Sequence, residues 1–210
     1  MTKKIQTVLV VGAHPDDIEF GCGGTIAKHL ELGDFVYILI MTNGEKGSHS
    51  VNKEECLNSL KELGLAKENI FFGNFSDGFL RDNHKTVTFI EDIIKKINAT
   101  KVYTHYPEDR HQDHRYCSLA VSSAARKIPE ILLFQGPSTS SLFEPHYFIG
   151  LSRKNLDKKL QSLSFYKTQL KKGIVNLKLA ENLAGVNGFH CNTEYAEAFV
   201  INHILKKEDV

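Results

Sequence analysis

Histidine and aspartate side chains follow directly on an apolar run near the start of the chain. Residues 8–11 read Val-Leu-Val-Val, the pattern of a strand that is buried on both faces. His14, Asp16 and Asp17 come immediately afterwards, and Pro15 fixes its own φ and favours an extended backbone at His14. In open α/β sheets, ligands bind beyond the ends of such strands. The turn therefore brings an imidazole and two carboxylates to a predicted binding edge.

A second polar segment, 108–114, also follows a predicted buried strand and reads Glu-Asp-Arg-His-Gln-Asp-His. If a helix begins near Gln112, His111 and His114 lie three residues apart and can face the same way. Together the two segments offer a metal two imidazoles and one carboxylate, from His14, Asp17 and His114. Three protein ligands plus a water is the pattern of a catalytic zinc site. We therefore predict bound Zn²⁺, with another divalent metal as the alternative.

Apolar runs and helical patterns alternate along the chain. The predicted strands are 5–11, 35–41, 70–72, 101–105, 130–134, 147–151 and 198–204, and the predicted helices are 23–32, 53–63, 87–97, 114–127 and 156–170. This alternation favours a mostly parallel central sheet with helices on both faces, an α/β fold. The spacing after Gly12 does not fit the dinucleotide fingerprint G-x-G-x-x-G. Without a repeat or a linker in the sequence, we expect residues 1–210 to form a single domain.

Composition gives no sign of a nucleic-acid or membrane partner. The chain has 210 residues and a formal net charge of +1, so nothing calls for a nucleic-acid partner. The four cysteines form no C-x-x-C pair, as expected for reduced thiols in the cytoplasm. The sequence shows neither signal-peptide features nor an apolar run of the roughly 20 residues that span a bilayer. We expect a cytoplasmic protein without a membrane partner, and leave a homo-oligomer open.

Both polar segments match the motifs of one enzyme family. Residues 13–17, Ala-His-Pro-Asp-Asp, resemble the A-H-P-D-D signature of the zinc-dependent de-N-acetylases, called PIG-L-like or LmbE-like. Residues 110–114 resemble the second motif of this family, R-H-P-D-H, with Gln112 in place of the proline. Weaker matches are the T-x-G-E loop at 42–45, the D-G turn at 77–78 and a Y-A-E-A-F segment at 195–199. The resemblance therefore covers most of the chain.

The resemblance implies a Rossmann-like α/β fold and a divalent metal, usually zinc, held by His14, Asp17 and His114. It also implies that Asp16 is the general base and that His111 stabilises the oxyanion while an acetyl group leaves an N-acetylglucosamine unit. We expect Asp113 to orient His111 from behind. The residues that we expect to contact substrate are Arg110, Asp77 and Glu45.

The substrate is less well defined than the chemistry. The family often has an arginine near residue 53 and another before the Y-A-E-A-F segment, and this chain has Asn52 and Lys53 at the first place and none in 183–191. We expect a small, soluble, polar N-acetyl amino sugar, with loops 136–141 and 183–191 at the pocket rim. The alternatives are a metal-dependent amidase or phosphoesterase for another small metabolite, or a non-catalytic sugar- or nucleotide-binding module.

Overall fold

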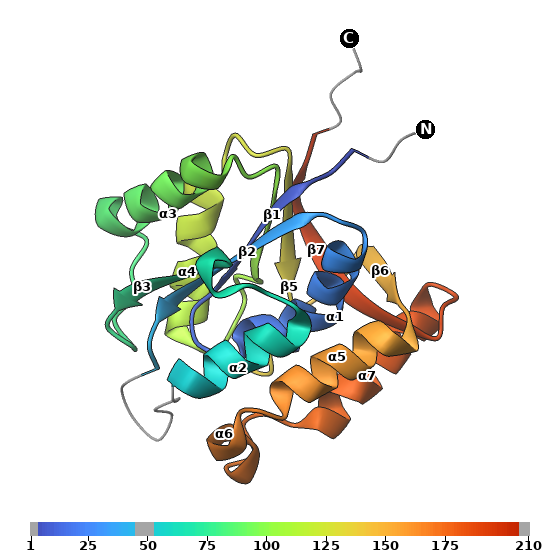
Figure 1. The fold of residues 1–210 in the computed structure, drawn as a ribbon. Coiled ribbons are helices and arrows are strands. Elements are labelled where there is room, and N and C mark those ends of the chain that lie inside the picture. Colours follow the sequence, from blue (N-terminus) through green and yellow to red (C-terminus); the bar gives the residue numbers. More distant parts are fainter. Residues whose placement is uncertain (1–3, 45–52, 206–210) are drawn as a thin grey trace.

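A computed structural model describes residues 4–44 and 53–205. Their strands form one sheet in the order β3-β2-β1-β4-β5-β7-β6 (Figure 1). The strands are β1 (Thr7–Gly12), β2 (Phe35–Thr42), β3 (Ile70–Phe75), β4 (Lys101–His105), β5 (Glu130–Phe134), β6 (Tyr147–Leu151) and β7 (Tyr195–Ile204). Strands β1 to β5 are mutually parallel, and β7 runs antiparallel to both β5 and β6. The predicted mostly parallel α/β fold is confirmed.

Helices cover both faces of this sheet (Figure 1). They are α1 (Asp17–Glu31), α2 (Lys53–Leu63), α3 (His84–Ile97), α4 (Gln112–Ala124), α5 (Arg153–Leu163), α6 (Lys167–Lys171) and α7 (Leu177–His190), with a 3₁₀ turn at Lys67–Asn69. One face packs against α3 and α4, and the other against α1, α2, α5 and α7. Val8 and Val10 of β1 enter the second of these cores, while Leu9 and Val11 enter the first. Double coverage is why this strand is apolar throughout.

The parallel strands bring the polar segments to one edge of the sheet. Strands β1 and β2 pair in register from Thr7 opposite Phe35 to Gly12 opposite Ile40, and β4 lies on the other side of β1. Parallel strands place all their carboxyl ends at the same edge, so the loops that follow β1, β3, β4 and β5 converge there. The chain thereby joins segments that are about a hundred residues apart in sequence.

Three predicted elements differ from the structure. Helix α1 begins at Asp17 instead of residue 23. Its backbone leaves helical angles at Cys22, where φ is −148° and ψ is 25°, so the predicted helix corresponds to the part of α1 after this kink. The predicted helix 156–170 is divided into α5 and α6. The predicted loop 183–191 is wrong, since most of it lies inside α7. Its Gly188 is a packing residue: a Cβ there would lie 2.6 Å from the carbonyl oxygen of Glu194.

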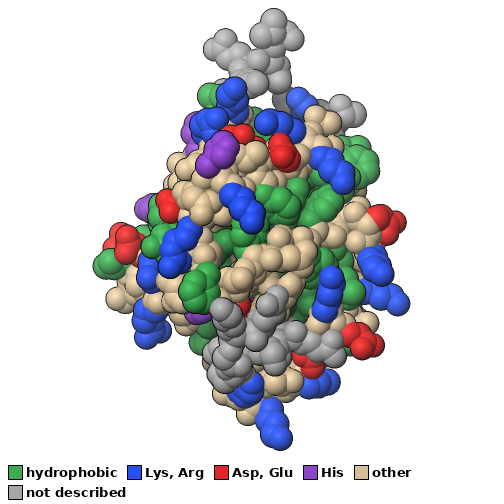
Figure 2. Space-filling view, turned by 90° about the vertical axis from the view of Figure 1, so that its left-hand side faces the viewer, with side chains coloured by type: hydrophobic (Ala, Val, Ile, Leu, Met, Phe, Trp, Pro, Cys, Tyr) green, Lys and Arg blue, Asp and Glu red, His purple; other side chains and the backbone are tan. Residues whose placement is uncertain are grey.

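Charged side chains of both signs are scattered over the face shown in Figure 2, without one basic patch among the residues coloured there. This mixture agrees with a formal net charge of +1. Within residues 4–44 and 53–205, no helix has the length and apolar character needed to cross a membrane.

Candidate metal centre and active site

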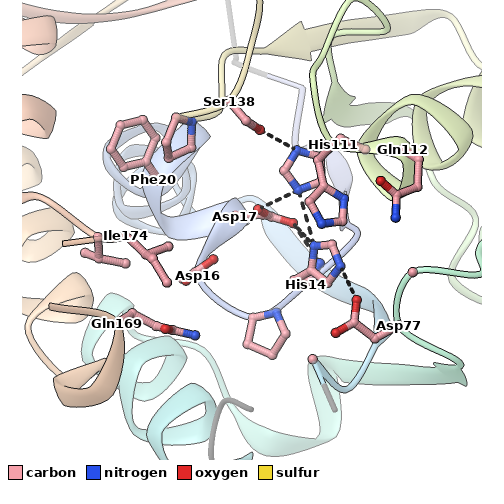
Figure 3. A pocket seen from close by; sticks show the side chains of 16 residues that line it. His14, Asp16, Asp17, Phe20, Asp77, His111, Gln112, Ser138, Gln169 and Ile174 are labelled. Atoms are coloured by element: carbon pink, nitrogen blue, oxygen red, sulfur yellow. Dashed lines mark hydrogen bonds and ion pairs between the residues drawn. The ribbon is translucent and has the colours of Figure 1, made fainter. Parts of the chain in front are cut away.

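The turn after β1 forms the floor of a cavity of about 290 Å³. Asp16 caps α1 with a φ of 86°, a left-handed backbone that is uncommon outside glycine and often marks functional sites. The backbone N–H of His14 donates to Asp17 Oδ2 at 2.7 Å, which closes the turn. His14, Asp16 and Asp17 all line the cavity, as do His111 and His114 from the loop after β4 and the first turn of α4 (Figure 3).

The three predicted metal ligands meet at one point. His14 Nδ1 lies 3.2 Å from His114 Nε2 and 3.4 Å from Asp17 Oδ2. His114 Nε2 lies 3.2 Å from Asp17 Oδ1. Zinc–ligand bonds of about 2.0–2.2 Å at tetrahedral angles separate donor atoms by roughly 3.3–3.6 Å. The spacing of these donor atoms therefore fits a single divalent cation.

Carboxylates contact the outer nitrogens of both imidazoles. His14 Nε2 lies 3.1 Å from Asp77 Oδ1 and 3.3 Å from Asp113 Oδ2. His114 Nδ1 lies 3.2 Å from Asp109 Oδ1. A carboxylate on the outer nitrogen holds the ring proton there and leaves the lone pair of the inner nitrogen for a metal, as in carboxylate–histidine–zinc arrangements. Both histidines therefore have the partners of metal-ligating side chains.

A further buried imidazole, His105 at the end of β4, stacks on His114 with ring centroids 4.1 Å apart. Its Nε2 accepts the backbone N–H of Ala13 at 3.0 Å and lies 3.2 Å from Asp17 Oδ2. Burial lowers the pKa of His105 to about 4, so the ring is neutral. Because the Nε2 lone pair already accepts from Ala13, we place His105 beside the ligand set. Sequence analysis missed it, although its position at a strand end was a usable signal.

Neighbouring groups shift the pKa values of this cluster in opposite directions. Burial alone would lower the pKa of His14 and His114, but neighbouring carboxylates outweigh it, raising that of His14 well above its usual range and that of His114 to about 9. Burial would raise the pKa of Asp17, yet the neighbouring charge of His114 holds it well below its usual range. For Asp16, burial and the neighbouring charge of Asp17 raise the pKa strongly. Two adjacent carboxylates thus have opposite protonation preferences, a pattern typical of acid–base sites.

His111 occupies the N-cap of α4. Its Nδ1 accepts the backbone N–H of Asp113 at 3.2 Å, so the proton of the neutral ring lies on Nε2. Its own backbone N–H donates to Asp109 Oδ1 at 2.8 Å. Burial and the charges of His14 and His114 lower the pKa of His111. A neutral imidazole with an N–H donor therefore borders the cavity beside the candidate metal ligands.

The remaining predicted residues take varied places. The carboxylate of Asp113 accepts from the backbone N–H groups of Gly78 at 2.6 Å and Leu80 at 3.2 Å, and contacts His14. This corrects the expected role of its side chain behind His111, since the Asp113–His111 hydrogen bond uses the Asp113 backbone. Asp77 lines the cavity. Arg110 is exposed, and its Nε donates to the Ser138 carbonyl at 3.3 Å. Glu45 lies outside the described residues.

Asp109 is a site residue that sequence analysis did not single out, although it belongs to the second polar segment. Its side chain is buried and contacts His114 and the His111 backbone, as described above. Ser138 Oγ donates to Asp109 Oδ1 at 2.6 Å, and Thr139 Oγ1 donates to Oδ2 at 2.9 Å. This carboxylate joins the loop after β4 to the loop after β5.

The rim of the cavity is only partly as predicted. Pro137 and Ser138 of the predicted loop 136–141 line it, whereas 183–191 does not contribute. The second rim segment is instead formed by Gln169 of α6 together with Ile174 and Val175.

Comparisons with known proteins agree with this geometry. The family model "PIG-L: GlcNAc-PI de-N-acetylase" matches residues 9–125. The uncharacterized deacetylase YaiS of Escherichia coli is 36% identical over 174 residues, which cover 79% of this chain and 92% of YaiS. The diacetylchitobiose deacetylase of Thermococcus kodakarensis is 27% identical over 202 residues, covering 82% of this chain and 73% of that protein.

The crystal structure of the conserved protein TT1542 from Thermus thermophilus superposes with a TM-score of 0.83 at 26% identity, covering 97% of each chain. The family model spans more than half of this chain, and both polar segments lie inside the matched range. The chain therefore belongs to the PIG-L family of de-N-acetylases.

Proposed function

We propose that this protein hydrolyses the N-acetyl group of an N-acetylglucosamine-type amino sugar, using a divalent cation, most simply Zn²⁺, held by His14, Asp17 and His114. One observation carries the proposal. The facing nitrogens of His14 and His114 lie 3.2 Å apart, and each lies within 3.4 Å of one oxygen of the Asp17 carboxylate. The outer nitrogens of both imidazoles contact carboxylates. Family membership and a relative that is a diacetylchitobiose deacetylase support the amino-sugar substrate.

The residues that line the cavity can supply the proton transfers and the hydrogen bonds that amide hydrolysis needs. A divalent cation bound by these ligands would polarise the amide carbonyl and lower the pKa of water. Asp16 lines the cavity beside the ligands, so its carboxylate can take the proton of the attacking water and return it to the departing amine. The Nε2–H of His111 can donate to the oxyanion that develops on the carbonyl oxygen. Asp113 and Asp77 hold the His14 ring, and Asp109 holds the His114 ring.

The proposal extends to the substrate contacts and to the location of the protein. Asp77 and Gln112 line the cavity and can bond sugar hydroxyls, while substrate contacts by Arg110 and Glu45 remain predictions. We propose a small soluble substrate and a cytoplasmic location. The four cysteines are free, as expected for reduced thiols. Residues 1–210 are proposed to act as one domain.

The test is a substrate panel for the metal-loaded protein. It contains N-acetylglucosamine, N,N′-diacetylchitobiose, N-acetyl amino acids and phosphate monoesters, and both amine and phosphate release are measured. We expect amine and acetate in equal amounts from an amino sugar, abolished by a chelator and restored by Zn²⁺. If only the N-acetyl amino acids were hydrolysed, the amino-sugar assignment would be wrong. Phosphate release would favour the phosphoesterase, and binding without turnover would favour a non-catalytic module.

A further inference from the structure

The cavity has two chemically different sides. Asp77 and Gln112 lie on one side of the candidate metal ligands in Figure 3, and Phe20 and Ile174 lie on the other, with Asp16 facing the second side. Gln169 also lies on the second side in Figure 3, and Pro137 and Val175, which follows Ile174 in the chain, are further apolar residues of the lining. We call Phe20, Pro137, Ile174 and Val175 the apolar wall.

The apolar wall is fixed to helix α1 by buried contacts. Tyr166, at the N-cap of α6, donates its hydroxyl to Glu19 Oε1 at 2.7 Å, and both side chains are buried. Gly173 then turns the chain with a φ of 72°. The backbone N–H groups of Ile174 and Val175 return to the Gln169 carbonyl at 3.0 and 3.4 Å.

Packing also joins the wall to α1. Val175 is 3% exposed and belongs to the same hydrophobic cluster as Phe20. The wall is therefore a built surface, and its shape does not depend on a ligand.

A bound amide has to divide its substituents between the two sides. Its carbonyl belongs beside the metal ligands and His111, so the acyl group and the sugar extend in different directions. Sugar hydroxyls that are buried without hydrogen-bond partners are costly, which favours the side with Asp77 and Gln112. An acyl chain needs no such partners and gains from leaving water, which favours the apolar wall.

The wall also exceeds what an acetyl group can use. The methyl of an acetyl group fills only a small part of the cavity of about 290 Å³. Of the wall residues, Pro137 and Ile174 keep exposed surface, whereas Phe20 and Val175 are nearly buried. A longer chain would remove more of that surface from water, and each additional buried methylene adds to binding.

We propose that the apolar wall is an acyl subsite that accepts N-acyl amino sugars with chains longer than acetyl. This inference rests on the proposed function and changes only the acyl group. The amide C–N bond is broken, water supplies a hydroxyl to the acyl carbon and a proton to the amine, and the products are a short-chain fatty acid and a free amino sugar.

The test compares N-acetyl-, N-butyryl- and N-hexanoylglucosamine as substrates of the full-length, metal-loaded protein, with kcat/KM measured by amine release. Burial of one methylene should raise kcat/KM about fourfold, so the butyryl substrate, with two more methylenes, should exceed the acetyl substrate by about 15-fold. A series that is flat or falls with chain length, while the acetyl substrate is still hydrolysed, overturns the subsite. It would leave the proposed function intact.

Variants locate the effect. Ile174→Thr keeps the branching at Cβ but replaces the ethyl arm by a hydroxyl, and should lower the butyryl-to-acetyl ratio at least threefold. Ile204→Thr is the matched control, because Ile204 lies 37% exposed at the end of β7 and outside the cavity lining. Val175→Thr provides a second, independent change to the wall. Equal ratios in the wild type and in both wall variants would contradict the assignment.

Two further arms separate the alternatives. Aryl glycosides of N-acetylglucosamine carry the apolar group on the sugar, so faster turnover of these than of the longer acyl chains would assign the wall to the aglycone and overturn the acyl subsite. If metal-loaded protein released no amine from any acylated sugar, the proposed function itself would fail, and the subsite with it.

Discussion

The buried carboxylate of Asp109 should govern metal affinity without touching the metal. It is 5% exposed and lies 3.2 Å from the outer nitrogen of His114. Asp109→Asn keeps the shape of the side chain but removes the charge that holds the His114 proton. A hydrogen bond to a charged group contributes about 1.5–3 kcal/mol. At about 1.4 kcal/mol per tenfold change, we expect Zn²⁺ affinity to fall by about 10- to 100-fold, as for other outer-sphere partners.

Asp109→Ala should lower the stability of the apoprotein in addition to its metal affinity. It also leaves the hydroxyls of Ser138 and Thr139 and the His111 backbone N–H without their acceptor, so the apoprotein should lose stability as well. The asparagine variant separates the two effects, because loss of metal affinity should exceed any loss of apoprotein stability.

The assay is a competition titration of apoprotein against a chromophoric zinc chelator, paired with urea unfolding of the same apoprotein. Glu108→Gln is the control, since it makes the same carboxylate-to-amide change at the preceding, exposed residue. If Asp109→Asn bound Zn²⁺ within twofold of the wild type, the argument that Asp109 positions His114 for the metal would be refuted.

Three other changes have distinct expected results. Asp16→Asn should keep stoichiometric metal and lower kcat by about 10²–10⁴-fold, because an amide cannot transfer the proton. Metal analysis and kinetics on the same sample check this, and near-normal turnover would mean that another residue is the general base. His111→Ala should lower kcat by about 10²–10³-fold and alter KM little, whereas a change in KM alone would make His111 a binding residue. Lys159→Met leaves the buried Glu197 carboxylate without its 2.6 Å partner, so urea unfolding should show a loss of about 3–5 kcal/mol, and a loss below 1 kcal/mol would mean that the backbone donors suffice.

The sheet could be predicted from sequence because its central strands are buried on both faces. The predicted ranges 101–105, 130–134 and 147–151 coincide with β4, β5 and β6. Each is a short run of apolar or β-branched residues that is flanked by polar or turn-forming residues. Once the parallel sheet is accepted, the meeting of His14 and Asp17 with His114 follows from topology, because the carboxyl ends of β1 and β4 lie side by side. No long-range contact had to be guessed.

Side-chain direction could not be predicted in the same way. Asp113 lies in the first turn of α4, and its sequence position is compatible with a contact to His111. In the fold, however, two backbone N–H groups of the turn after β3 point at it and need an acceptor, so its carboxylate joins that turn and His14. His105 and Asp109 were missed for a related reason. Each contacts a predicted metal ligand from behind, and spacing in the sequence alone does not distinguish such residues from packing residues.

The Y-A-E-A-F segment shows how a residue outside the cavity can still affect the site. Glu197 of this segment is 3% exposed, and its carboxylate accepts the backbone N–H groups of Gly24 at 3.0 Å and Thr25 at 2.6 Å. These are donors exposed where α1 resumes after its kink at Cys22, the position at which a helix start favours negative charge.

Without an acceptor at this point, the interruption at Cys22 would bury unsatisfied backbone groups, and the first half of α1 would lose a fixed direction relative to the second. That first half begins at Asp17. Glu197, neutralised by Lys159 of α5, therefore connects the last strand and the α5 layer to the helix that carries a predicted metal ligand. The segment can therefore support the candidate metal centre without contacting it, because the direction of α1 helps to set the 3.2–3.4 Å contacts of Asp17 with His14 and His114.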